Sequence, residues 1–81
     1  MLHNTIEKQN IYIIIAKNIK KYRKLQKMTQ KELSKKTGYS YAYIRRIEGP
    51  NCAKNFSILT IYNICEALNI DISSIFDDDN I

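Results

Sequence analysis

Two short helices, each bounded by its own start and stop signals, place the strongest constraint on how this chain folds. Thr29 and Glu32 have the spacing of a capping box, in which the threonine is the N-cap and the glutamate reaches back to its amide. Gly38 follows as a residue that ends a helix cheaply in the left-handed conformation. Ser40 is a second N-cap, and the helix that it opens ends at Gly49. Two short helices joined by a glycine-containing turn are typical of a helix-turn-helix unit.

The hydrophobic periodicity is helical through most of the chain. Ile15, Ile19 and Tyr22 recur at intervals of three and four residues, which predicts an amphipathic helix that begins between residues 4 and 10 and ends near residue 26. Ile6 and Ile13 lie on the opposite side of this helix, among lysines. Either these two side chains cover a partner surface, or the segment 11–15 is partly extended, because β-formers are enriched there. The helix is favoured.

Two more helices are expected after a loop at residues 50–56, with Ser57 and Asp71 as their N-caps. The buried face expected for the fourth helix consists of Ile58, Ile61, Ile64, Cys65 and Leu68. The last short helix carries Ile72, Ile75 and Phe76. The sequence therefore predicts an all-α, compact five-helix domain that contains a helix-turn-helix and occupies residues 11–76. Residues 1–10 are an N-terminal extension that either precedes helix one or continues into it, and residues 77–81 are an acidic tail.

Charge is divided unequally along the 81 residues. The segment Lys8–Lys54 contains all 13 basic residues and two acidic ones, which gives it a net charge of +11. Every charged residue after this segment is acidic. This division favours a polyanionic partner on one side of the molecule, and the alternative is that the lysines only solvate the helices.

Other classes of function are disfavoured by the residues that the sequence lacks. It has one histidine, no glycine-rich phosphate loop and no paired carboxylates in a structured region, so we expect neither an enzyme nor a cofactor. Cys52 and Cys65 have no partner at metal-ligand spacing, so we expect no metal, with Cys65 in the core and Cys52 in a loop. No apolar run is long enough to span a bilayer and no secretory signal is present, so we expect no membrane partner and a cytoplasmic location.

The two capped helices carry a resemblance to a known family. The sequence resembles the helix-turn-helix of the Cro/lambda-repressor (XRE-type) family in Thr29–Gly38 and in Ser40, Ile44, Ile47 and Glu48. The resemblance spans residues 15–76 and implies a lambda-repressor-like fold. It also implies a sequence-specific DNA-binding transcriptional regulator, of the kind found as single-domain restriction–modification controllers or mobile-element repressors.

In that family the second helix of the pair enters the major groove. The resemblance therefore assigns the recognition helix to residues 40–48 and places Tyr41, Ala42 and Arg46 against base edges. Arg46 can donate two hydrogen bonds to guanine, Ala42 can contact a thymine methyl group, and Tyr41 can stack or donate its hydroxyl.

The resemblance also implies contacts that carry no sequence information. Those to phosphates are Gln30 at the start of helix two, Tyr43 and Arg45 on the flanks of the recognition helix, and Lys54 and Asn55 in the following loop. A structural ion pair between Arg23 and Glu48 braces the recognition helix.

Three positions depart from the family pattern or need a separate interpretation. Tyr39 replaces an aliphatic turn residue and is expected at the rim of the core. Lys27 stands where the family commonly has glycine, so a left-handed residue there costs roughly 1 kcal/mol. The loop that begins at Gly49 is longer than the common form.

The expected partners are double-stranded DNA and a second copy of the chain, because one such unit binds weakly and two on a palindrome reach specific affinity. The apolar side chains expected at the interface of this homodimer are Ile72, Ile75, Phe76 and Ile13. The alternative is a protein-interaction or antitoxin-like module that keeps the fold and does not read DNA specifically.

Overall fold

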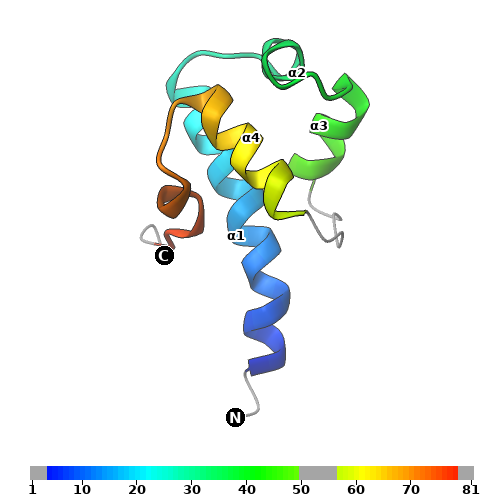
Figure 1. Cartoon of the computed structure of the whole chain (residues 1–81). Coiled ribbons are helices and arrows are strands. Elements are labelled where there is room, and N and C mark those ends of the chain that lie inside the picture. The colour runs from blue at the N-terminus through cyan, green and yellow to red at the C-terminus, as the bar shows by residue number, and fades with distance from the viewer. Residues whose placement is uncertain (1–3, 50–56, 79–81) are drawn as a thin grey trace.

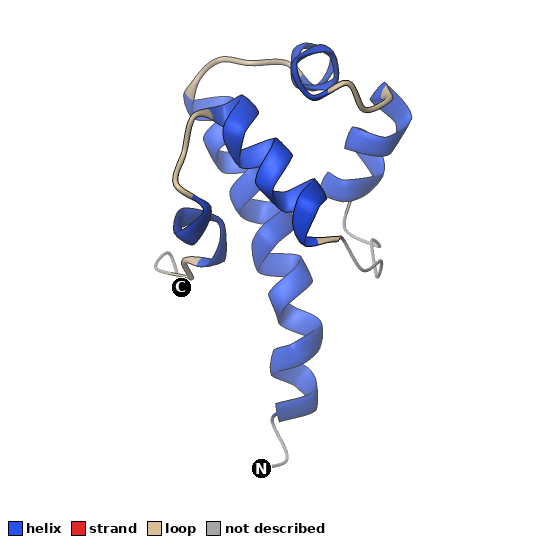
Figure 2. Ribbon diagram, in the orientation of Figure 1, coloured by secondary structure: helices blue, strands red, loops and turns tan. Residues whose placement is uncertain are grey.

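The computed structural model describes residues 4–49 and 57–78, with side chains described from residue 11 onward. In this part of the chain all regular structure is helical (Figures 1 and 2). The elements are α1 (Asn4–Leu25), α2 (Gln30–Thr37), α3 (Tyr41–Glu48), α4 (Ile58–Leu68) and the 3-10 helix η1 (Ile72–Phe76). Helix α1 begins at Asn4, so residues 4–10 continue into helix one, and its N-terminal part projects away from the other helices (Figure 1).

The prediction of five helices is therefore corrected for the described residues, in which four elements are α-helices and the last is a 3-10 helix. In η1 the amide of Ser74 donates to the carbonyl of Asp71 at 2.9 Å, the three-residue spacing of a 3-10 turn. The carboxylate of Asp71 makes no capping bond to the backbone of η1 and instead accepts from the hydroxyl of Ser73. A five-residue element without a side-chain cap is typical of an isolated 3-10 turn.

The start and stop signals of α2 and α3 act as the sequence predicts. The hydroxyl of Thr29 accepts from the amide of Glu32 at 3.0 Å, and the carboxylate of Glu32 accepts from the amide of Thr29 at 2.8 Å. Gly38 ends α2 with φ 83°, a conformation that glycine adopts without steric cost. The hydroxyl of Ser40 then accepts from the amide of Tyr43 at 3.0 Å. The capping box and the two-helix unit are therefore confirmed.

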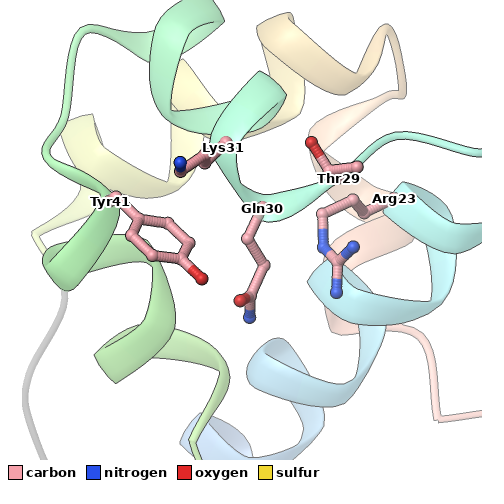
Figure 3. A pocket seen from close by; sticks show the side chains of 5 residues that line it. All are labelled: Arg23, Thr29, Gln30, Lys31 and Tyr41. Atoms are coloured by element: carbon pink, nitrogen blue, oxygen red, sulfur yellow. The ribbon is translucent and has the colours of Figure 1, made fainter.

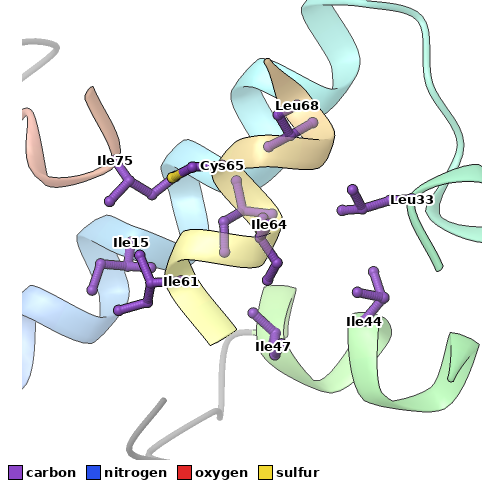
Figure 4. Packing of buried hydrophobic residues seen from close by; sticks show 10 residues of the cluster. Ile15, Leu33, Ile44, Ile47, Ile61, Ile64, Cys65, Leu68 and Ile75 are labelled. Carbon is purple, nitrogen blue, oxygen red and sulfur yellow. The ribbon is translucent and has the colours of Figure 1, made fainter. Parts of the chain in front are cut away.

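One apolar cluster lies where α1, α2, α3, α4 and η1 meet (Figure 4). Its buried members are Ile15, Ile19, Leu33, Ile44, Ile47, Ile61, Ile64, Cys65, Leu68 and Ile75. Burial raises the pKa of the Cys65 thiol to about 11, with a smaller contribution from the charge of Asp71, so this thiol stays protonated at neutral pH. The prediction that Ile58 belongs to the inward face of α4 is wrong. Ile58 is 67% exposed, because it is the first residue of α4 and lies past the end of the cluster, whose first α4 member is Ile61.

A buried polar residue attaches η1 to α1. The side-chain amide of Asn18 is 2% exposed and donates to the carbonyls of Ile75 and Asp77, both at 2.8 Å. An apolar side chain at position 18 would leave both carbonyls without this donor. Asn18 therefore fixes the end of the chain against α1 at a position that apolar periodicity does not identify.

Lys27 lies in the left-handed region, with φ 56°, in the turn between α1 and α2. In this turn the amide of Met28 donates to the carbonyl of Arg23 at 3.0 Å. A lysine in this conformation costs roughly 1 kcal/mol relative to glycine, so this departure from the family pattern is a local strain that the fold tolerates.

Candidate nucleic-acid interface

Helix α3 is anchored on one side and exposed on the other. Ile44 and Ile47 are buried in the core. The opposite side, here called the recognition face, consists of Tyr41, Ala42, Arg45 and Arg46, all of them exposed. Apolar spacing of three residues on an eight-residue helix produces this division, because the side chains between the two isoleucines must point outward. The structure thus brings together the three residues expected at base edges and one of those expected at phosphates.

Two cationic side chains lie over the ring of Tyr41. The ammonium group of Lys31 lies 5.8 Å from the centre of its ring, and the guanidinium carbon of Arg45 lies 5.6 Å from it. Cations over an aromatic face are attracted by the ring quadrupole. The first turn of α3 therefore presents an oriented aromatic ring with positive charge on it.

Tyr39 and Tyr43 form a second aromatic pair at the rim of the core. Their ring centres are 5.2 Å apart with an interplanar angle of 64°, an edge-to-face arrangement. The side-chain amide of Asn63 in α4 donates to the hydroxyl of Tyr39 at 3.0 Å. Both rings pack against the core cluster, so Tyr39 lies at the core rim as expected, and Tyr43 is half-buried beside it.

A nearly buried ion pair joins α1 to the end of α3. Arg23 donates through Nε to one carboxylate oxygen of Glu48 at 2.7 Å and through Nη2 to the other at 2.8 Å. Its Nη1 donates to the carbonyl of Met28 at 2.8 Å, and the side-chain amide of Gln30 donates to Glu48 at 3.1 Å. The Arg23 and Glu48 side chains are 8% and 1% exposed. The bidentate pair, together with the hydrogen bonds to Met28 and from Gln30, fixes α1, the following turn, α2 and α3 relative to one another.

A hollow of about 390 Å³ opens beside this network and is lined by Arg23, Thr29, Gln30, Lys31 and Tyr41 (Figure 3). Thr29 uses its hydroxyl and its carbonyl to satisfy the amides of Glu32 and Leu33. Among the described residues no hydrogen bond uses the amides of Gln30 and Lys31, the first two of α2. Free amides and a helix dipole at the rim of a cationic hollow favour an anionic group.

Two of the five residues that line the hollow were missed by sequence reasoning. The sequence pattern predicts only a capping role for Thr29 and predicts no role for Lys31. The available signal for Lys31 was its place directly after Gln30 in the first turn of α2. Of the expected phosphate contacts, Lys54 and Asn55 lie outside the described residues, as do Cys52 and most of the loop that follows Gly49.

Exposed apolar side chains lie on more than one helix. On α4, Ile58, Leu59 and Tyr62 are 67%, 62% and 50% exposed, and here they are called the α4 patch. Glu66 raises the pKa of Tyr62 by accepting a hydrogen bond from its hydroxyl and, to a smaller extent, by its negative charge. Ile13 lies on the exposed side of α1.

The residues expected at a dimer interface are not equally accessible. Ile75 is fully buried in the core of the chain, so it offers no surface to a second copy and is removed from the expected interface. Ile72 packs partly against the core, whereas Phe76 is exposed.

The described residues offer neither a metal site nor a membrane span. They contain no group of three or more histidine, cysteine, aspartate or glutamate side chains that could hold a metal ion. None of their helices combines the length and the apolar character needed to cross a membrane.

Comparisons with known proteins bear on the same segment. A family model described as helix-turn-helix matches residues 19–75. The fold is similar to the crystal structure of the restriction–modification controller protein C.AhdI from Aeromonas hydrophila, with a TM-score of 0.72 and 20% sequence identity. That match covers 80% of this chain and 96% of the controller chain. Curated proteins provide no sequence match.

Proposed function

The chain belongs to the XRE-type helix-turn-helix family of DNA-binding transcription regulators, and from this premise we propose that it binds a palindromic operator as a homodimer, with α3 in the major groove. The observation that carries this proposal is the two-sided character of α3. Its inner side is fixed by the core and by the Arg23–Glu48 pair, and its outer side presents two arginines. An element fixed in this way presents its base-reading side chains in one geometry, which sequence-specific recognition requires.

The recognition face supplies the contacts that distinguish bases. Arg46 donates two hydrogen bonds to O6 and N7 of a guanine, Ala42 contacts a thymine methyl group, and Tyr41 stacks or donates its hydroxyl. The cations of Lys31 and Arg45 over the ring of Tyr41 orient the ring and supply positive charge near the phosphates. The structure supports these assignments because all three side chains are exposed on one side of α3.

The hollow beside α2 takes a phosphate of the same duplex. The free amides of Gln30 and Lys31 donate to its oxygens, and the ammonium group of Lys31 balances its charge. The side chain of Gln30 already donates to Glu48, so in this proposal its backbone amide makes the phosphate contact. Arg45 contacts a second phosphate from the flank of α3, while Tyr43 acts chiefly through its packing on Tyr39.

The dimer forms through the α4 patch. A monomeric domain of this size has little reason to expose three large apolar side chains on one helix. The sequence of α4 contains no charged residue before Glu66, so two copies can approach through this helix without burying an unpaired charge. Phe76 and Ile72 extend the proposed interface from η1. Ile13 is left out because it lies about 200° around α1 from the buried Ile15 and shares its side with lysines.

Replacing Arg46 by alanine is expected to relax one base position in each half-site and to cost about 1–3 kcal/mol of binding free energy per half-site. The adjacent Arg45→Ala variant is the matched control, since it removes the same charge from the same helix and should leave the preference at the base that Arg46 contacts unchanged. Titration of both variants against the operator and its single-base variants measures the difference. Equal weakening by both variants at every base would remove Arg46 from the base-reading role.

A further inference from the structure

Three lysines on α1 form a charged surface that the proposed operator contacts leave unused. Lys17, Lys20 and Lys24, here called the lysine track, are all exposed and recur at intervals of three and four residues. They lie on one side of the helix and span about 10 Å along its axis. No ion pair joins any of them to a carboxylate within the part of the chain that the structure describes. Acidic residues are absent from α1 after Glu7, so the track is a continuous positive surface.

The track adjoins the candidate nucleic-acid interface. Arg23 lines the hollow and is directly followed by Lys24, while Lys20 lies one turn before it on α1. Both lysines are within about 100° of Arg23 around the helix. Figure 3 shows α1 passing along one side of the hollow, away from Lys31 and Tyr41. The track therefore extends the positive surface of the hollow along α1.

From these positions we propose that the lysine track binds the phosphate backbone of the duplex whose major groove receives α3. The inference rests on the proposed function, because α3 positions the duplex. A second copy of α1 is a poor occupant, since it would place the same three positive charges opposite these. DNA is a better one, because its phosphates follow one another at about 3.4 Å per strand along the axis, so a row of lysines can meet more than one. Lys17 precedes residues 19–75, so the track reaches beyond the segment matched by the family model.

The direct test is the salt dependence of binding to the full chain with Lys17→Gln and Lys20→Gln combined. These two residues are chosen because neither lines the hollow. Each phosphate contact contributes about 0.9 to the slope of log K against log salt concentration. The bound dimer carries both substitutions in each of its two copies, so four contacts are lost and we expect the slope to fall by about 3.6. Equivalently, between 50 and 200 mM salt the affinity of the unmodified dimer should fall by roughly a hundredfold more than the affinity of the variant.

The matched control combines Lys35→Gln with Lys36→Gln, two exposed lysines in the last turn of α2, whereas the hollow is lined by residues at the beginning of α2. It removes the same charge and should leave the slope nearly unchanged. Both variants should bind the operator and a scrambled duplex with the unmodified ratio, because phosphate contacts are indifferent to sequence. Equal slopes for the two variants would overturn the proposal. If the unmodified chain shows no preference for the operator over the scrambled duplex, the proposed function is contradicted. The comparison of the two salt slopes, made on either duplex, would still show whether the lysine track contacts phosphates.

Discussion

Replacing Glu48 by alanine is expected to lower the free energy of unfolding by about 3–5 kcal/mol. The carboxylate accepts two hydrogen bonds from Arg23 and one from Gln30, and its side chain is 1% exposed. Without it, the guanidinium of Arg23 remains nearly buried with only the carbonyl of Met28 as a partner. Domains of this kind have only about 5–15 kcal/mol of stability, so the loss is a large fraction of the total.

Urea unfolding followed by circular dichroism measures this effect, with Asp78→Ala as the control. Asp78 is an exposed carboxylate outside the helices, so its replacement should change stability by less than about 0.5 kcal/mol. A combined Arg23→Met and Glu48→Leu variant should be more stable than Glu48→Ala, because it removes both charges and leaves neither unpaired. If Glu48→Ala unfolds at the same urea concentration as Asp78→Ala, the pair does not brace α3.

Replacing Leu59 by aspartate is expected to convert the dimer into a monomer. Leu59 is 62% exposed in the chain, so the substitution opens no cavity and the fold should remain intact. In the proposed dimer it places a charge in an apolar interface, on each side of the symmetry axis. Affinity for the palindromic operator should then fall at least about a hundredfold, because linking two half-site binders contributes that much without any new contact.

Sedimentation analysis of Leu59→Asp and Ile13→Asp separates the α4 patch from α1. Like Leu59, Ile13 is an exposed aliphatic side chain. It is 44% accessible and lies on the side of α1 that faces away from the core. The proposed interface predicts a monomer for Leu59→Asp and a dimer for Ile13→Asp. Binding of Leu59→Asp to a duplex that holds a single half-site should match that of the unmodified chain. The reverse pattern of oligomeric states would assign the interface to α1.

The sequence predicts the helix-turn-helix well because local chemistry determines it. Thr29, Ser40 and Gly38 each satisfy or end a helix through groups within a few residues, so their spacing alone specifies the unit. The recognition face follows in the same way from Ile44 and Ile47, which can be buried only if the residues between them point outward.

What the sequence does not predict depends on contacts between distant segments. Asn18 is buried because two carbonyls 57 and 59 residues away need a donor, and no local pattern reveals them. Ile58 continues the apolar periodicity of α4, yet it is exposed because the part of α4 that packs in the core begins only at Ile61, one turn later in the helix. The prediction that Ile75 lies at a dimer interface is wrong because the packing of η1 buries this side chain completely, and no local pattern in the sequence reveals that packing. Dimer surfaces are therefore harder to predict than recognition helices.

The most direct test of the account is selection of bound sequences from a random duplex library, followed by titration of the selected duplex and a scrambled duplex at several salt concentrations. We expect a palindromic sequence, bound at least about a thousandfold more tightly than the scrambled duplex. Its symmetry would show that two copies of the chain bind together. Equal and steeply salt-dependent binding to both duplexes would contradict the account, because only the phosphate charge would then be recognised.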